Sequence, residues 1–247
     1  MTIEYQLPRR RQPFYSFVKG IIKIFMRKKR VIVLGGELED KCLYLANHAN
    51  KMGPMNYDLY FPLYHVKWGA HEMLEGYGER RKYLRDVLYI QKNGVGRRRA
   101  AFKAFFEAFF SQFIYKGMKI IPTYPDMRST RTLKKSVEIL ENNIALMIFP
   151  EDSNSGYNSE ITSFFTGFVL VAEIYSRKHG EDVPIRPVYL HRKKRLIVVG
   201  EGVTLGKLRE QGMQITAMAD YMRDRVNELY HRIESGEFDK KKGKNKT

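Results

Sequence analysis

Apolar residues follow two alternating patterns along the chain. Short continuous apolar runs are typical of buried strands, whereas apolar residues three or four positions apart are typical of amphipathic helices. The runs predict strands at residues 31–35, 42–47, 118–124, 145–149, 184–190 and 195–203. The spaced positions predict helices at residues 14–30, 55–65, 83–91, 99–115, 129–141, 159–178 and 206–234.

The alternation of strands and helices predicts the fold class. We expect a single α/β domain with a mostly parallel or mixed central sheet flanked by helices, preceded by a basic amphipathic N-terminal helix. No internal repeat or interior linker divides the sequence. The predicted organisation is a basic leader and amphipathic helix at residues 1–30, the α/β domain at residues 31–236 and a disordered basic tail at residues 237–247.

Two of the predicted helices have apolar faces that allow two interpretations. In the first, Phe and Ile lie opposite Lys and Arg, which suits either an anionic membrane interface or a helix that covers one face of the domain. The second has six phenylalanines at helical spacing. Such a stripe is ordinarily core, and the alternative is the wall of an acyl-chain tunnel or a membrane-dipping face. The residues are Phe14, Phe17, Val18, Ile21 and Phe25 in the first helix, and Phe102, Phe105, Phe106, Phe109, Phe110 and Phe113 in the second.

Composition narrows the class of protein. The 247 residues are 43% hydrophobic and include 16 Tyr and 15 Phe, which excludes a disordered chain. The single Cys42 excludes an intrachain disulfide and fits a reducing compartment. No apolar stretch reaches the ~18–20 residues of a membrane span, and the first residues lack the order of a signal peptide. We therefore expect a cytoplasmic protein.

The net charge of +17 adds information about partners. A field of this sign attracts polyanions, which include nucleic acid, an anionic membrane surface and phosphorylated small molecules. The basic residues are spread along the whole chain and form no motif of a known nucleic-acid-binding module. This distribution argues against nucleic acid as a partner.

The candidate chemistry lies where predicted strands end. Asn47 and His48 follow one strand, residues 124–131 follow another, and Pro150 and Glu151 follow a third. In open α/β sheets, ligands bind at the carboxyl ends of the strands. A histidine base, a carboxylate that orients it and arginines for a phosphate would form an acyl- or phosphoryl-transfer site. A lone histidine is also common as a structural residue, so spacing alone leaves the role of His48 open.

The order of several segments resembles the glycerolphosphate acyltransferase superfamily, whose bacterial members include the lysophosphatidic acid acyltransferases. The resemblance covers roughly residues 31–203 and depends on the order of its motifs, because none is decisive alone. The matching segments are the opening strand and turn at residues 31–38, Leu45-Ala46-Asn47-His48, Ile120-Ile121-Pro122 with Arg128, Phe149-Pro150-Glu151, residues 165–168, and Val183-Pro184-Ile185-Arg186-Pro187-Val188.

This resemblance implies a reaction and its partners. In the superfamily, the histidine deprotonates a hydroxyl of a glycerol-based acceptor, which attacks the thioester of acyl-coenzyme A or acyl carrier protein. His48 would be the base, and Asn47, Arg128, Arg131, Pro150 and Glu151 would bind substrate. The implied partners are a lysolipid or glycerolphosphate-like acceptor, the anionic inner face of the cell membrane and the acidic acyl carrier protein. No metal and no cofactor beyond the thioester co-substrate are expected.

The sequence departs from the superfamily pattern at the group that orients the histidine. Gly53 stands where the pattern has an aspartate, and Asp58 is the nearest downstream carboxylate. Asp58 is therefore the predicted second catalytic residue, with Glu151 and Glu72 as alternatives for orienting His48.

The third motif departs as well. Asn154 replaces its usual arginine, and Asp152 would repel a phosphate. Phosphate recognition would then move to Arg128 or Arg131. These departures leave a second functional hypothesis, a non-catalytic lipid- or acyl-carrier-binding relative on the same fold.

Overall fold

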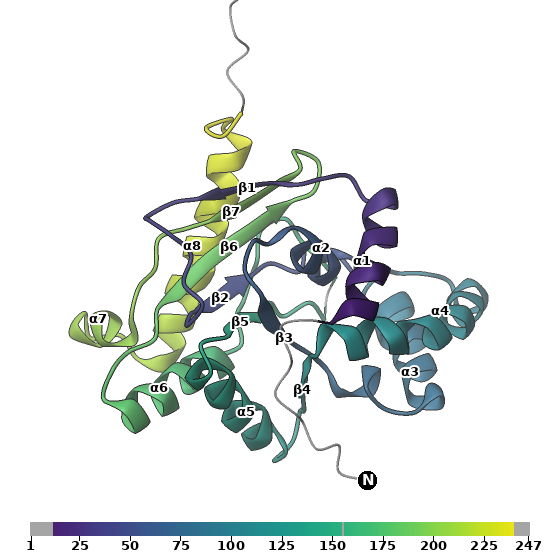
Figure 1. Cartoon of the computed structure of the whole chain (residues 1–247), viewed down its shortest axis with the longest axis horizontal. Coiled ribbons are helices and arrows are strands. Elements are labelled where there is room, and N and C mark those ends of the chain that lie inside the picture. The colour runs from purple at the N-terminus through teal and green to yellow at the C-terminus, as the bar shows by residue number, and fades with distance from the viewer. Residues whose placement is uncertain (1–11, 155, 240–247) are drawn as a thin grey trace, which may run out of the picture.

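The chain folds around one seven-stranded sheet (Figure 1). The computed structural model describes residues 12–154 and 156–239. Within these residues the strand order is β1-β7-β6-β2-β5-β3-β4, and only the β6–β7 pair is antiparallel. The strands are β1 (Arg30–Val33), β2 (Leu43–Ala46), β3 (His65–Ala70), β4 (Ile121–Thr123), β5 (Ala145–Ile148), β6 (Ile185–His191) and β7 (Leu196–Val199).

The centre of the sheet shows why the apolar runs predicted strands. β2 pairs in parallel with β5 on one side and with β6 on the other, and all four of its residues are buried. A strand covered on both faces has a continuous apolar run rather than an alternating one. The predicted single α/β domain with a mixed, mostly parallel sheet and an N-terminal helix is confirmed.

Helices cover both faces of the sheet and one of its ends. α5, α6, α7 and α8 pack on one face, and α2 packs on the other. α1, α3 and α4 gather beside β3 and β4, on the right in Figure 1. The α-helices are α1 (Pro13–Phe25), α2 (Gly53–Tyr60), α3 (Tyr77–Tyr83), α4 (Arg97–Met118), α5 (Ser129–Glu141), α6 (Gly167–His179), α7 (Leu205–Glu210) and α8 (Ile215–Glu234), joined by a 3-10 helix η1 (His71–Met73) and a π-helix η2 (Leu84–Gln91).

Four helical predictions were too long. The helix predicted at residues 14–30 ends at Phe25, and the helix predicted at residues 159–178 begins at Gly167. The predicted helix at residues 55–65 ends at Tyr60, and the strand β3 begins at His65, after Pro62. Proline disfavours helical geometry at the residue before it, so Phe61 is extended and the helix stops. The predicted helix at residues 206–234 is divided into α7 and α8 near Gly212, whose φ of 74° belongs to the left-handed region.

The interpretation of the phenylalanines in α4 as core was wrong. α4 instead packs against the domain with small residues, Ala100, Ala104, Ala108 and Ser111. The six phenylalanines are 49–69% exposed. Small residues permit a close approach of helix and domain, and the large aromatic rings are left on the opposite side.

Helix α1 also turns much of its apolar surface outward. Tyr15 is its buried residue, and Val18, Ile22 and Met26 pack partly against the domain. The expected stripe is mostly exposed, with Phe14 at 69% and Phe25 at 83%. The helix therefore covers the domain with one side and presents aromatic residues with the other. In the part of the chain that the structure describes, no helix has the length and hydropathy to cross a bilayer.

Candidate functional site

His48 lies directly after the central strand β2, next to the end of β5. The backbone N–H of His48 donates a hydrogen bond of 2.9 Å to Oε2 of Glu151. Glu151 is itself 6% exposed, and burial raises its pKa. The fold thus brings together two of the predicted strand ends, 47–48 and 150–151. The carboxylate of Glu151 therefore bonds to the backbone of His48 and not to its imidazole ring.

The neighbouring predicted residues hold the local backbone. Both ends of the Asn47 amide bond to the backbone of Leu190 in β6, and Tyr57 donates a further hydrogen bond of 2.8 Å to Oδ1 of Asn47. The buried Pro150 accepts a hydrogen bond from the N–H of Phe165 through its carbonyl oxygen. These bonds fix the position from which the His48 side chain projects.

Aromatic rings surround the imidazole of His48. Its ring centroid lies 4.9 Å from that of Phe149 and 5.2 Å from that of Tyr157. Its Nδ1 atom is buried and has no hydrogen-bond partner among the described residues. Burial and, after it, the charge of Lys92 lower the pKa of His48 to about 4, although the hydrogen bond from the backbone of Asn50 acts in the opposite direction. The imidazole is therefore neutral at physiological pH and able to accept a proton.

Asp58 does not orient His48, so that prediction needs correction. Its carboxylate accepts a hydrogen bond of 2.9 Å from Tyr15 and one from the buried ammonium of Lys67, and Lys19 lies 3.5 Å away. Burial raises the pKa of Asp58, but the nearby cations, Lys67 first, outweigh it and hold the pKa well below its usual range. Asp58 lies on the side of α2 that faces α1 and β3.

The second alternative, Glu72, is also engaged elsewhere. Its carboxylate lies 3.2 Å from His71 in η1. None of the three predicted carboxylates therefore bonds to the His48 ring. Packing between Phe149 and Tyr157 holds the imidazole in place instead.

A cavity of about 100 Å³ opens beside His48. Three lysines line it from three different elements. Lys67 comes from β3, Lys92 follows η2 and donates a hydrogen bond of 2.7 Å to the Ser153 hydroxyl, and Lys51 bonds to Glu107 of α4. The cavity thus places positive charge near a neutral base.

Sequence reasoning missed Lys67, Lys92 and Tyr157. Lys67 lies in the unpredicted strand β3, and Lys92 follows a helix that gave no chemical signal. The available signal for β3 was Pro62, which excludes a continuous helix through residues 55–65, followed by the strand-forming Val66 and Trp68.

The predicted phosphate-binding arginines lie away from this cavity. Arg128 is exposed, pairs with Asp126 at 2.7 Å and stacks 4.4 Å from the ring centroid of Tyr124. Arg131 is exposed on α5. Both follow β4, which is an edge strand two positions from β5. The strand end at residues 124–131 therefore lies apart from those at residues 47–48 and 150–151.

The arrangement at His48 suits proton abstraction from a hydroxyl. A neutral imidazole accepts the proton, and nearby ammonium groups stabilise negative charge that develops on an oxygen. Over residues 12–154 and 156–239, no group of three or more His, Cys, Asp or Glu side chains is placed to hold a metal ion.

Comparisons with known proteins find similarity among solved structures only. No family model matches the sequence, and no curated protein matches it. Among solved structures, the chain is similar to the 1-acyl-sn-glycerophosphate (LPA) acyltransferase PlsC from Thermotoga maritima. The TM-score is 0.44 at 15% sequence identity, over 90% of this chain and 89% of that chain.

Proposed function

We propose that this protein transfers an acyl group from a thioester donor to a hydroxyl of a lysophospholipid or glycerolphosphate-like acceptor, with His48 as the general base. The donor would be acyl-coenzyme A or acyl carrier protein. The observation that carries the proposal is the neutral, half-buried imidazole beside a cavity lined by Lys51, Lys67 and Lys92, at the carboxyl ends of β2 and β5.

The proposed reaction has two proton transfers, both at His48. The imidazole takes the proton of the acceptor hydroxyl as its oxygen forms a bond to the thioester carbonyl carbon. The carbonyl oxygen becomes negatively charged, and the ammonium groups of Lys67 and Lys92 stabilise it. The carbon–sulfur bond then breaks, and the imidazolium returns its proton to the leaving thiolate. The products are an ester and a free thiol.

Asp58 has a positioning role in this proposal. It is the buried counter-ion of Lys67, whose side chain lines the cavity. Because Arg128 and Arg131 lie outside the cavity, we assign contact with an acceptor phosphate to the cavity lysines. Asn47, Pro150 and Glu151 would support the site through the backbone of β2 and β5.

The basic surface of α1 supports two partners of this reaction. Lys23 is exposed on α1, and Arg27 and Lys28 are exposed just after it. Together with the exposed aromatic residues of α1 they favour an anionic membrane surface such as the inner face of the cell membrane. The acidic acyl carrier protein would also be attracted by a chain of charge +17.

The proposal is tested by acyl transfer. Purified protein would be incubated with radiolabelled acyl-coenzyme A or acyl carrier protein and a panel of lysolipids, glycerol phosphate and other alcohols. We expect labelled ester with at least one acceptor, and a loss of about 10²–10⁴-fold in rate for His48→Ala, as is typical for a removed general base. A matched control is His179→Ala, because His179 lies at the end of α6, bonds to Glu141 and does not line the His48 cavity.

The lack of a carboxylate on the His48 ring supports a second candidate function. Asp58, Glu72 and Glu151 all bond to other groups, as a non-catalytic lipid- or acyl-carrier-binding relative would permit. Lipid binding that survives His48→Ala, with no turnover by the native protein on any acceptor, would favour this candidate over the acyltransferase.

A further inference from the structure

An aromatic surface on α4 has no partner among the described residues. We define the phenylalanine face as Phe102, Phe105, Phe106, Phe109, Phe110 and Phe113, which are 49–69% exposed. Soluble monomers rarely expose contiguous apolar patches of this kind, and such patches mark sites of interaction with proteins or membranes.

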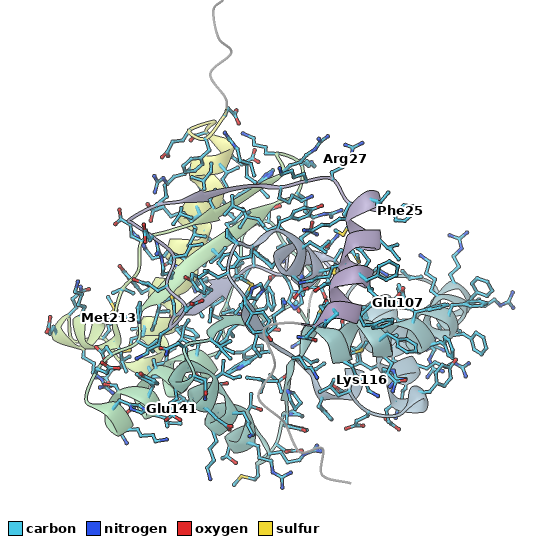
Figure 2. All side chains as sticks on the ribbon, viewed as in Figure 1. Phe25, Arg27, Glu107, Lys116, Glu141 and Met213 are labelled. Carbon is cyan, nitrogen blue, oxygen red and sulfur yellow. The ribbon has the colours of Figure 1, made fainter. Side chains whose placement is uncertain are left out.

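Helix α1 packs against the C-terminal end of α4. The ring of Tyr15 packs against Gly117 of α4 so closely that a Cβ there would lie 2.1 Å from the ring. Phe14, Phe17 and Phe25 are exposed on the side of α1 that turns away from the domain. Figure 2 shows Phe25 pointing outward from the end of α1, above the line of α4. The two helices therefore present their aromatic residues from one packed unit.

Apart from Glu107, the charged residues of α4 are all cations. α4 begins with Arg97, Arg98 and Arg99 and carries Lys103 and Lys116. Its acidic residue, Glu107, is occupied by Lys51 and Tyr89 on the side of the cavity. A second copy of this chain would bring like charges together, whereas an anionic bilayer offers both an apolar interior for the rings and negative charge for the flanking cations.

We propose that the phenylalanine face of α4 inserts into the boundary between head groups and acyl chains of an anionic bilayer. The other side of the same helix, through Glu107 and Tyr115, lines the His48 cavity. An acyl chain that leaves the bilayer beside α4 is thus already next to the proposed base. This inference names the membrane-binding element for the proposed function and does not depend on turnover.

The experiment is flotation with vesicles of phosphatidylcholine alone and of phosphatidylcholine with about 30% phosphatidylglycerol, at low and high salt. The native protein should float with the anionic vesicles and less so at high salt. Phe106→Gln with Phe109→Gln should weaken binding at least tenfold, because insertion scales with buried apolar area. The matched control, Met127→Gln with Ile215→Gln, changes exposed apolar residues elsewhere and should float like the native protein.

Three outcomes would overturn the proposal. In the first, the native protein does not bind the anionic vesicles. In the second, the two double variants bind the vesicles equally well. In the third, the native protein is a dimer, and Phe106→Gln with Phe109→Gln converts it to a monomer without changing its flotation. His48→Ala should float like the native protein, so a failure of the catalytic proposal leaves this result unaffected. Thermal unfolding of each variant shows whether it is folded, as expected for exposed positions.

A second cavity, independent of the phenylalanine face, points to a ligand site. It has a volume of about 860 Å³ and lies on the other side of Tyr157 from the His48 cavity, since Tyr157 lines both. This volume lies within the range of small-molecule sites. Its walls carry the rings of Tyr157, Tyr189, His191 and Tyr230, with Tyr230 nearly parallel to His191 at an interplanar angle of 10°.

Cations from two separate segments rim this cavity. Arg27 and Lys29 follow α1, and Arg192 and Lys193 form the turn between β6 and β7. Burial and the charges of Arg195, Arg192 and Arg27 lower the pKa of Lys29, which shows that these cations repel one another. The carboxylate in the cavity, Glu234, is bonded to His191 at 2.6 Å. An incoming anion would relieve the repulsion.

We infer that this cavity binds a phosphate-bearing group, with an aromatic wall that suits a planar ring. The chemistry is shared by a phosphorylated nucleotide, such as the head group of a coenzyme-linked thioester, and by a phosphorylated lipid head group. The inference uses the proposed function only for the adjacency to His48.

Calorimetry would measure binding to four probes. They are adenosine 3′,5′-bisphosphate, sn-glycerol 3-phosphate, inorganic phosphate and anionic vesicles. We expect saturable binding that Arg192→Gln with Lys193→Gln weakens at least tenfold. Arg177→Gln with Lys178→Gln removes the same charge from α6 and should leave binding unchanged. Tighter binding of the bisphosphate identifies a nucleotide, and binding confined to vesicles identifies a lipid head group. The site would be refuted if the two double variants weakened binding equally, or if the native protein showed no saturable binding to any probe.

Discussion

Gly53 explains why the spacing after His48 departs from the superfamily pattern. A Cβ at position 53 would lie 1.6 Å from the carbonyl oxygen of His48, a distance that no rotamer can relieve because the contact is with backbone. The chain turns sharply after His48, and the N–H of Asn50 bonds to the same carbonyl oxygen at 2.6 Å. Position 53 thus contributes a close backbone approach, and a carboxylate there would need a different loop.

We predict that side chains at position 53 are not tolerated. Gly53→Ala should lower the free energy of unfolding by about 1–3 kcal/mol, the usual cost of overpacking, and should reduce acyl transfer because His48 moves. Gly53→Asp, which restores the superfamily residue, should not restore activity. Gly78→Ala is the matched control in α3, where a Cβ meets nothing within 4 Å, and it should stabilise by ~0.5–1 kcal/mol. Equal melting temperatures for Gly53→Ala and Gly78→Ala would contradict this account.

The pH dependence of activity follows from the environment of His48. Its pKa of about 4 lies below the value of ~6.5 for a free histidine, so the base stays unprotonated and kcat/KM should fall only as the pH drops toward 4. Lys92→Met removes a positive charge that disfavours imidazolium, so the pKa of His48 should rise and the acid limb should move to higher pH. NMR titration of the His48 ring beside the pH–rate profile checks both. A limb that stays in place or moves to lower pH would exclude this role for Lys92.

The same shift has a consequence for stability. The unfolded chain takes up a proton at His48 near pH 6.5, whereas the folded protein resists it until about pH 4. The unfolded state therefore binds more protons between these values, and this site makes stability fall as the pH is lowered through that window.

At the scale of elements, one buried ion pair joins three segments. Asp58 of α2 accepts hydrogen bonds from Lys67 of β3 and from Tyr15 of α1. The Lys67 side chain is 1% exposed and that of Asp58 is 8% exposed. Such pairs contribute little relative to apolar residues, but removal of one partner leaves the other charge buried without compensation. The pair therefore fixes where α1 and the cavity lysine lie.

We predict that Asp58→Asn lowers the free energy of unfolding by about 3–5 kcal/mol, because Lys67 is left buried without its counter-ion. Tyr15→Phe removes one hydrogen bond and should cost about 1 kcal/mol. Chemical denaturation measures both. If Asp58 oriented His48, Asp58→Asn would shift the acid limb of the pH–rate profile. We expect instead that the Asp58→Asn protein that remains folded has the same acid limb as the native protein. A stability like that of the native protein would show that the ion pair is not formed.

The sequence predicted best those elements whose environment is uniform along their length. β2 and β5 are buried on both faces and were recognised from continuous apolar runs, and α5 was predicted with its observed bounds, Ser129–Glu141. β3 was missed because its buried Lys67 is neutralised by Asp58, a contact between elements that no pattern along the chain reveals.

The order of the strands decides which predicted site residues meet. His48 and Glu151 meet because both follow central parallel strands. Arg128 follows β4, and only the strand order shows that β4 lies at the edge. The side of α2 on which Asp58 lies depends on the sharp turn at Gly53.

At the scale of the whole molecule, the buried residues form separate clusters with different packing. One cluster joins the sheet to α5, α6 and α8, with large side chains such as Leu43, Ile148 and Phe168. Another joins α1, α2, α3, η2 and α4, where α4 contributes mainly alanine. A helix that buries small residues and exposes large ones gains little from packing in water, so its stability depends more on what covers its outer face.

We predict that amide exchange follows this division. In the absence of lipid, peptides of β2 and β5 should exchange most slowly, because they are central and buried on both sides, and peptides of α4 should exchange through local opening at lower free energy. Hydrogen–deuterium exchange read by mass spectrometry measures both in one sample. Addition of anionic vesicles should slow exchange in α4 and leave β2 and β5 unchanged, because lipid stabilises only the state with which it makes contact. Protection of α4 equal to that of β2 in water would show that the alanine packing alone is sufficient to hold the helix.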